Sequence, residues 1–150
     1  MLLMLIQFSV ENFLSIKEKV VLSLLASKDN EHPNHLIADE TNRYLKSAVI
    51  YGANASGKSN VLNAFWFMVN YVLTSHNQQL HKTIARSPFK FDPETPARPS
   101  SFEVIFTTEG VRYAYGFSVT DSAVTEEYLY YYPNGRKALI FERKNTKDFR

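Results

Sequence analysis

Gly52-Ala53-Asn54-Ala55-Ser56-Gly57-Lys58-Ser59 is the stretch that decides the fold of this chain, because it fits the pattern G-x-x-x-x-G-K-[ST] at every fixed position. The glycines let the backbone turn tightly, so that successive N–H groups point inward while the following helix presents its positive end. In such a phosphate-binding loop, Lys58 reaches the outer phosphates of a nucleotide and the Ser59 hydroxyl ligates Mg²⁺. We predict that residues 52–60, the last being Asn60, hold a nucleotide, with Mg²⁺ at Ser59.

The segments on both sides of the loop follow the order that the motif requires. Residues 48–51 are a short apolar run, which predicts a buried parallel strand. Apolar residues then recur at steps of three and four, which predicts a helix that begins near Lys58 and has one wide apolar face. This face comprises Val61, Leu62, Phe65, Trp66, Met68, Val69, Val72 and Leu73. A Gly- and Ser-rich turn that binds nothing is the weaker interpretation of the loop.

The composition is that of a globular chain. Of its 150 residues, 45% are hydrophobic and 14% aromatic, which is ample for the core of one domain. The apolar start at residues 1–6 has no basic n-region and soon alternates with polar residues, which predicts a strand and not a signal peptide. No apolar stretch reaches the roughly twenty residues of a membrane span. Because cysteine is also absent, we expect a cytoplasmic protein without membrane contact.

The residues before and after the loop and its helix fall into recognisable segments. Alternation up to about Leu25 predicts an antiparallel pair of strands, and the polar stretch 27–42 predicts a surface loop. Residues 75–79 are expected to end the helix, and four prolines in 88–99 predict an irregular connection. From Ser101 onward the period is two, with turns near 109–110, 121–122 and 133–135, which predicts an antiparallel meander of four strands.

Three other features of the sequence are weaker candidates for binding or metal sites. The meander is rich in tyrosine, which favours strands and only secondarily a base-stacking platform. The basic end, 133–150, is expected to be a solvated face more than a contact for nucleic acid or an acidic partner. His32 and His35 lie three apart around Pro33 without a cysteine or carboxylate pair nearby, so a metal site there is improbable.

The loop and its neighbours resemble a known family. The run from Tyr51 to Ala64, with Asn54 and Asn60, is similar to the G-x-N-x-S-G-K-S-N loop of ABC-like ATPases of the SMC, RecF and OLD group. Residues 8–17 resemble the strand and N-F-x-S turn with which these ATPases begin, although Leu14 stands where many relatives have Arg or Lys. The meander also looks like that of the prokaryotic fifteenth AAA subfamily, whose RloA-like members are linked to abortive infection and phage defence.

The resemblance implies an α/β fold of mixed α+β character. The expected architecture is a P-loop NTPase, with the first lobe of an ABC/SMC-like head and an antiparallel β-meander subdomain on an incomplete core. Residues 1–150 would form the N-terminal part of one ATPase domain. Within it, 1–73 would hold the first strands, loop and helix, 74–100 the irregular connection and 101–150 the meander.

The resemblance also implies how such a chain works. These ATPases use ATP and Mg²⁺, a glutamate after Walker B and a signature motif from a second subunit, and these 150 residues contain neither motif. We therefore expect ATP binding, no catalytic residue in this chain, and hydrolysis that is absent or very slow in this chain alone. In the full protein, ATP would join two heads into a homo-oligomer.

The predicted function is a nucleotide-driven assembly switch, used in prokaryotic phage defence to control an effector protein or nuclease. One alternative is a DNA-repair ATPase of the SMC or RecF type, which predicts salt-dependent DNA binding through the basic end. Another is a non-enzymatic interaction module with a degenerate nucleotide site. A small GTPase is disfavoured, because the lysine of 145–148 is misplaced for base recognition.

Overall fold

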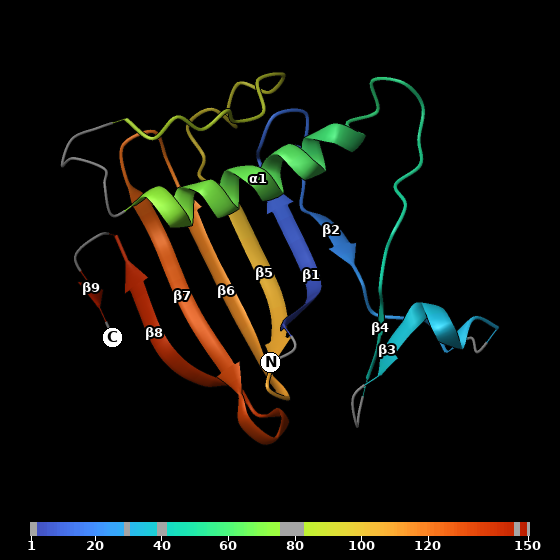
Figure 1. Cartoon of the computed structure of the whole chain (residues 1–150). Coiled ribbons are helices and arrows are strands. Elements are labelled where there is room, and N and C mark those ends of the chain that lie inside the picture. Colours follow the sequence, from blue (N-terminus) through green and yellow to red (C-terminus); the bar gives the residue numbers. More distant parts are fainter. Residues whose placement is uncertain (1–2, 29–30, 39–41, 76–82, 146–147, 150) are drawn as a thin grey trace.

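A seven-stranded sheet is the largest element of the fold, with strand order β2-β1-β5-β6-β7-β8-β9 (Figure 1). The computed structural model describes residues 3–28, 31–38, 42–75, 83–145 and 148–149. The strands are β1 (Leu3–Glu11), β2 (Val20–Ser23), β5 (Ser100–Thr108), β6 (Val111–Val119), β7 (Val124–Tyr132), β8 (Ala138–Lys144) and β9 (Asp148–Phe149). Every neighbouring pair is antiparallel. The chain is thus a mixed α/β structure that is mostly antiparallel sheet.

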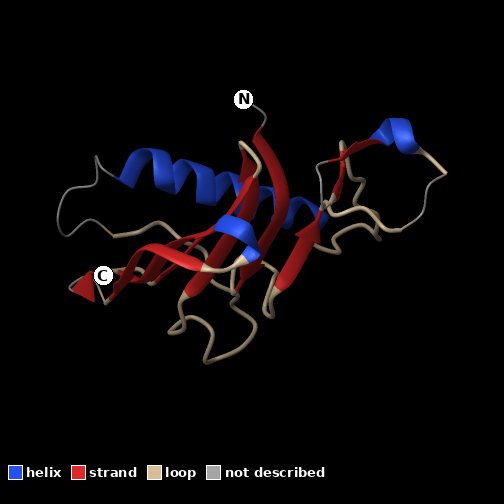
Figure 2. Ribbon diagram, turned by 90° about the horizontal axis from the view of Figure 1, so that it is seen from below, coloured by secondary structure: helices blue, strands red, loops and turns tan. Residues whose placement is uncertain are grey.

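The helix α1 (Lys58–Thr74) lies across one face of this sheet (Figures 1 and 2). Because side chains alternate between the faces of a strand, every second residue of the central strands points towards the helix. The buried cluster between the two layers comprises Phe8, Val10, Phe13, Ile16, Ala64, Met68, Ile84, Phe102, Phe117 and Val119. Phe67 of the helix lies 5.1 Å, centroid to centroid, from both Phe13 and Phe102. Aromatic packing therefore fixes the helix on the sheet.

The predicted apolar face of the helix is only partly correct. Met68 is buried, and Val61 and Phe65 pack against the core, as expected. The other members of the predicted face are exposed: Leu62, Trp66, Val69, Val72 and Leu73. Ala64, Phe67 and Tyr71 complete the inner side instead. The reason is that α1 is apolar on nearly all sides, so its sequence period does not single out the side that packs.

The predicted strand at residues 48–51 is wrong for this structure. Residues 47–53 form no strand, and Val49 and Tyr51 are 70% and 86% exposed. A strand is stable only beside a neighbour, and a parallel neighbour requires a long crossover connection. All strand pairs in the described part of the chain are antiparallel, so this segment has no parallel neighbour among those residues.

The polar stretch 27–42 holds more regular structure than predicted. A 3₁₀ turn, Pro33–His35, leads into β3 (Leu36–Ala38), which pairs with β4 (Arg43–Leu45). This small hairpin stands to one side of the main sheet (Figure 2). Tyr44 anchors it, because its side chain is buried and its backbone bridges to Leu25. A single large buried residue explains why a mostly polar sequence still pairs here.

The expected N-terminal pair and the meander are confirmed. β1 pairs with β2, and β5 to β8 follow one another as antiparallel neighbours. The expected helix end at 75–79 lies mostly outside the described residues. Ser75 caps the C-terminus of α1, and its backbone N–H donates to the Tyr71 carbonyl. Residues 83–99 form no strand or helix, as four prolines predict.

Candidate functional site

The phosphate-binding loop makes a sharp turn directly onto the first residue of α1. Ala55 and Gly57 have φ angles of 64° and 90°, in the left-handed region that a tight loop requires. The amide of Ser56 donates to the Ala53 carbonyl over 3.2 Å, and that of Asn60 donates to the Gly57 carbonyl over 2.9 Å. Together these bonds join the loop to the first turn of the helix.

Lys58 folds back over the loop that precedes it. Its Nζ donates to the carbonyls of Gly52 and Ala53 over 2.8 and 2.6 Å. The ammonium charge is therefore fixed at the start of the loop. Gly52 leaves room for the Ser56 side chain, because a Cβ at position 52 would lie 2.7 Å from the Ser56 hydroxyl oxygen.

The loop also offers unused backbone donors. Within the described residues, the amides of Asn54, Ala55 and Gly57 have no hydrogen-bond partner. They stand beside the N-terminus of α1, where the helix dipole favours negative charge. Ser59 is exposed in the first turn of the helix. Free amides, a fixed ammonium group and a nearby hydroxyl fit a phosphate group with its Mg²⁺ ion.

A second segment reaches the loop from the main sheet. Ser15 lies in the turn after β1, and its Oγ accepts a hydrogen bond from Asn60 Nδ2 over 2.7 Å. A Cβ at Gly57 would lie 2.8 Å from the same Oγ. The structure therefore brings the turn at 13–16 against residues 57–60, an arrangement that spacing in the sequence does not predict.

Asn12, the first residue of the N-F-x-S turn, has a structural role that the sequence did not predict. Its side chain is fully buried, and Nδ2 donates to the carbonyls of Thr95, Arg98 and Pro99 at 2.8 to 3.1 Å. Its Oδ1 accepts from the Phe89 amide over 3.0 Å. One side chain thus ties the proline-rich connection to the turn beside the loop, and its partners lie more than seventy residues away.

Arg86 is a second residue that was missed. Its side chain is 1% exposed, and Nε pairs with Asp121 over 2.6 Å. The remaining donors reach the carbonyls of Pro96 and Arg98 and the hydroxyl of Ser100. A buried guanidinium with all these partners fastens the connection to the sheet, so this cation is structural.

The basic end is partly internal to the fold. Arg143 is about one-fifth exposed, and its Nη2 donates to Glu127 Oε2 over 2.6 Å. The other oxygen of Glu127 accepts from the Tyr115 hydroxyl over 2.8 Å. Burial, and then this hydrogen bond, raise the pKa of Tyr115 far above its ordinary value. Arg143 is therefore a member of a side-chain network, while Lys144 stays more than half exposed.

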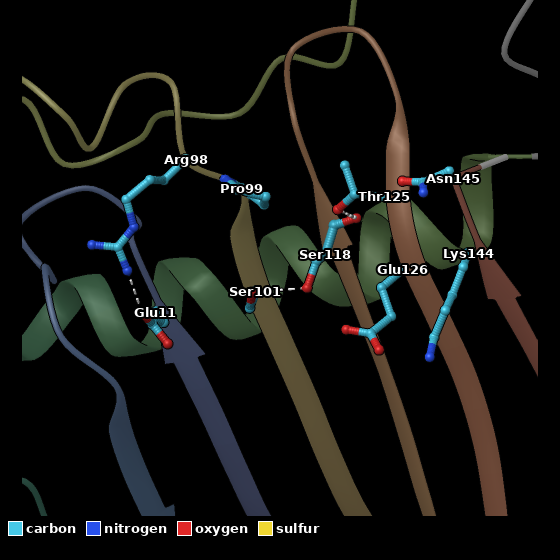
Figure 3. A pocket seen from close by; sticks show the side chains of 9 residues that line it. All are labelled: Glu11, Arg98, Pro99, Ser101, Ser118, Thr125, Glu126, Lys144 and Asn145. Carbon is cyan, nitrogen blue, oxygen red and sulfur yellow. Dashed lines mark hydrogen bonds and ion pairs between the residues drawn. The ribbon is translucent and has the colours of Figure 1, made fainter.

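An open hollow of about 330 Å³ lies near the ends of β1, β5, β6, β7 and β8 (Figure 3). It is lined by Glu11, Arg98, Pro99, Ser101, Ser118, Thr125, Glu126, Lys144 and Asn145. Arg98 already pairs with Glu11 over 2.9 Å, and Ser101 shares a hydrogen bond with Ser118. The lining mixes both charges, so it has no clear preference for an anion or a cation.

A comparison of the sequence with known protein families gives a match that includes the loop. A family model described as "AAA domain, putative AbiEii toxin, Type IV TA system" matches residues 47–150, well over half of the chain. The matched range contains the loop, α1 and the meander. None of the curated proteins matches the chain. Within the described residues, no helix combines the length and apolarity that a membrane crossing demands.

Proposed function

Since this chain belongs to that family of AAA domains, P-loop ATPases of the AAA and ABC type, we propose that its residues 52–60 bind ATP together with Mg²⁺. The observation that carries the proposal is the loop itself. Lys58 is fixed on the loop by two hydrogen bonds, beside amides at a helix N-terminus that have no partner among the described residues. The Ser59 hydroxyl would hold Mg²⁺, and the bound ion would supply positive charge that neutralises the phosphates.

Each residue of the loop has a definite part in this proposal. The amides of Asn54, Ala55 and Gly57 would donate to phosphate oxygens, as in other anion-binding nests. The Lys58 ammonium group would neutralise the outer phosphates. Ser59 would ligate Mg²⁺ through its hydroxyl, and Asn60 would brace the first turn through Ser15.

Thermal unfolding with and without ATP and Mg²⁺ tests the proposal. A ligand at one hundred times its dissociation constant stabilises the folded state by about 2.7 kcal/mol, which raises the melting temperature measurably. We expect this shift for the natural sequence and its loss in Lys58→Ala. Lys137→Ala is the matched control, because Lys137 lies between β7 and β8, with its Nζ over the Tyr130 ring.

The outcomes separate the alternatives. A shift that survives Lys137→Ala and disappears in Lys58→Ala supports a working nucleotide site. A folded chain that shows no shift overturns the proposal and favours a non-enzymatic interaction module with a degenerate loop. A comparison of ATP with GTP in the same assay identifies the preferred base.

We propose further that this chain is the first lobe of an SMC- or OLD-like head and part of a larger ATPase core. Val49 and Tyr51 are exposed just before the loop, and Trp66 and Leu73 are exposed on the outer side of α1. A helix that is apolar on all sides is typical of burial on all sides. A parallel sheet laid over α1, with residues 48–51 as one strand, would cover both surfaces.

In the whole protein we propose an assembly switch. ATP held between two copies of the head would join them, and the joined state would control an effector protein or nuclease. The description of the family, which names a putative AbiEii toxin, supports a role in phage defence. The fifteenth AAA subfamily is the finer proposal, and it rests on the resemblance of the sequence alone. Sedimentation analysis of the full-length protein with ATP should show dimers that Lys58→Ala does not form.

DNA binding through the basic end receives less support. Arg143 pairs with Glu127, and Lys144 Nζ lies 3.6 Å from Glu142 Oε1. The charges of Arg143 and Lys144 are therefore partly neutralised within the sheet. A DNA-clamping ATPase would require these cations for phosphate contacts. A filter-binding titration with duplex DNA at two salt concentrations should therefore show weak binding that Lys144→Ala does not change.

A further inference from the structure

The turn between β1 and β2 is a small hairpin with a fixed tip. The amide of Phe13 donates to the Ile16 carbonyl, and the amide of Ile16 donates to the Phe13 carbonyl, both over 2.9 Å. Phe13 and Ile16 are buried in the core, so the two sides of the hairpin are anchored. Leu14 and Ser15 form the tip between them. The position of Ser15 is thus set by the main sheet.

The tip is held against other segments as well. Leu14 has a φ of 52°, an uncommon value for a residue with a side chain, and its amide donates to the Ser87 carbonyl over 2.7 Å. An unfavourable backbone angle persists only where the surroundings enforce it. Here the enforced geometry presents Ser15 to the loop, where its Oγ accepts a hydrogen bond from Asn60 Nδ2 and lies 2.8 Å from the position that a Cβ at Gly57 would take.

The loop has few other ties to the main sheet. Among the described residues, those from 47 to 56 make hydrogen bonds only with one another and with Lys58. Upstream, the segment 48–51 has no neighbouring strand. Downstream, the loop continues directly into α1. The bond from Asn60 to Ser15 is therefore the polar link between the first turn of α1 and the sheet.

We propose that Ser15 is a positioning residue for the phosphate-binding loop. Its hydroxyl fixes the Asn60 side chain and closes the space beside Gly57, so that the amides at the start of α1 keep their direction before a phosphate arrives. The inference rests on the proposed function, because it assigns a role at the same site. Preorganised donors bind an anion more tightly, since less freedom is lost on binding.

The first test measures the dissociation constant for a fluorescent ATP analogue, mant-ATP, with Mg²⁺. We expect Ser15→Ala to weaken binding about fivefold, which corresponds to the loss of one ordinary hydrogen bond. Asn60→Ala should weaken binding at least as much, and Ser15→Ala should add little to it. The double-mutant cycle thereby isolates the contact between the two side chains.

A second readout does not depend on the nucleotide. Amide hydrogen exchange at residues 57–61 should be faster in Ser15→Ala, because the first turn of α1 loses its brace. Ser101→Ala is the matched control, since the Ser101 hydroxyl makes a 2.8 Å bond to Ser118. It should change neither mant-ATP binding nor exchange at residues 57–61.

A third variant tests the packing at Gly57. Gly57→Ala introduces strain at a φ of 90° in any background, and in the described part of the chain the new Cβ would also lie 2.8 Å from the Ser15 Oγ. We therefore expect Gly57→Ala to weaken mant-ATP binding more in the natural background than in Ser15→Ala. Equal losses in the two backgrounds would contradict a close contact.

The outcomes distinguish this inference from the proposed function. If the natural chain binds mant-ATP and Lys58→Ala does not, unchanged affinity and unchanged exchange in Ser15→Ala overturn the role of Ser15 alone. If the natural chain does not bind, the proposed function fails and the role of Ser15 in binding fails with it. Faster exchange at residues 57–61 would then still support the structural contact.

Discussion

The inner and outer sides of α1 have similar chemistry and opposite surroundings. On the inner side, Ala64 and Met68 are buried against the antiparallel sheet. On the outer side, Trp66 and Leu73 are 68% and 65% exposed, although they are as apolar as their neighbours. Lys58 is the only charged residue of the helix. The difference teaches that the sheet buries one side of this helix and leaves its other apolar side exposed.

The same contrast continues into the segments that join the helix. The connection after the helix is fastened by Asn12 and Arg86, whose polar atoms are paired inside the fold. The segment before the loop is apolar and exposed, with Ile50 between Val49 and Tyr51. The connection after the helix is therefore braced by buried hydrogen bonds, whereas the segment before the loop exposes apolar surface.

Truncations on the two sides of α1 give the largest contrast. Met68→Ala should lower the free energy of unfolding by about 2–5 kcal/mol, because it leaves a cavity in the core. Leu73→Ala should change it by less than about 0.5 kcal/mol, since the side chain is mostly exposed. Both residues are good helix formers, so propensity contributes little to the difference. Urea unfolding followed by circular dichroism measures both values.

An outer-side variant that destabilises as much as Met68→Ala would break the comparison. It would show that Leu73 is packed in solution, by another copy of the chain or by a change in the fold. Repeating the measurement at two protein concentrations separates these cases, because only association depends on concentration.

Two asparagines provide the next contrast. Asn12→Ala should cost roughly 2–4 kcal/mol, because several buried carbonyls and the Phe89 amide lose their partner. Asn54→Ala should leave stability nearly unchanged, since Asn54 is exposed in the loop. The measurement is again urea unfolding. Equal losses would mean that the loop is as tightly held as the turn after β1.

Sequence reasoning succeeded where local pattern determines structure. Alternation and turn residues predicted β5 to β8, because hairpin partners are neighbours in the chain. The start of the helix at Lys58 was also predicted, because the loop motif places it there. For the site, the sequence supplied the loop residues, and their role in nucleotide binding stays a prediction.

Long-range partners account for what the sequence did not show. Arg86 meets Asp121 and Asn12 meets Thr95 only after the chain has folded, and neither pair has a spacing that predicts it. The contact of Ser15 with Asn60 bridges forty-five residues. The strand predicted at 48–51 failed for the converse reason, because its pattern demands neighbours that the described residues do not supply.

A smaller contrast concerns pH, and it sets two half-buried tyrosines of the sheet against an exposed one. Burial, followed by hydrogen bonds to Glu127 and Glu103, raises the pKa of Tyr115 and of Tyr128 above the ordinary value near 10. The folded chain keeps both phenols neutral where the unfolded chain ionises, so this contribution to stability is complete below about pH 10 and is lost as the pH rises further.

The predicted result is a fall in the free energy of unfolding between pH 8 and pH 10.5 that is smaller in Tyr115→Phe and in Tyr128→Phe. Urea unfolding at the two pH values measures it, and Tyr51→Phe, at a position 86% exposed, is the control. If all three variants show the same slope as the natural chain, the phenols are not protected by the sheet.

The smallest expected effect belongs to the apolar segment before the loop. Val49→Ser should change the free energy of unfolding of this chain by less than about 0.5 kcal/mol, because the side chain is already 70% exposed. Val10→Ser, in a buried position of β1, is the matched control and should be strongly destabilising. If residues 48–51 are a strand of a larger ATPase core, Val49→Ser should become costly in the full-length protein. A small effect in both settings would instead show that the segment stays exposed there, and that the outer side of α1 is covered by something other than a sheet containing this strand.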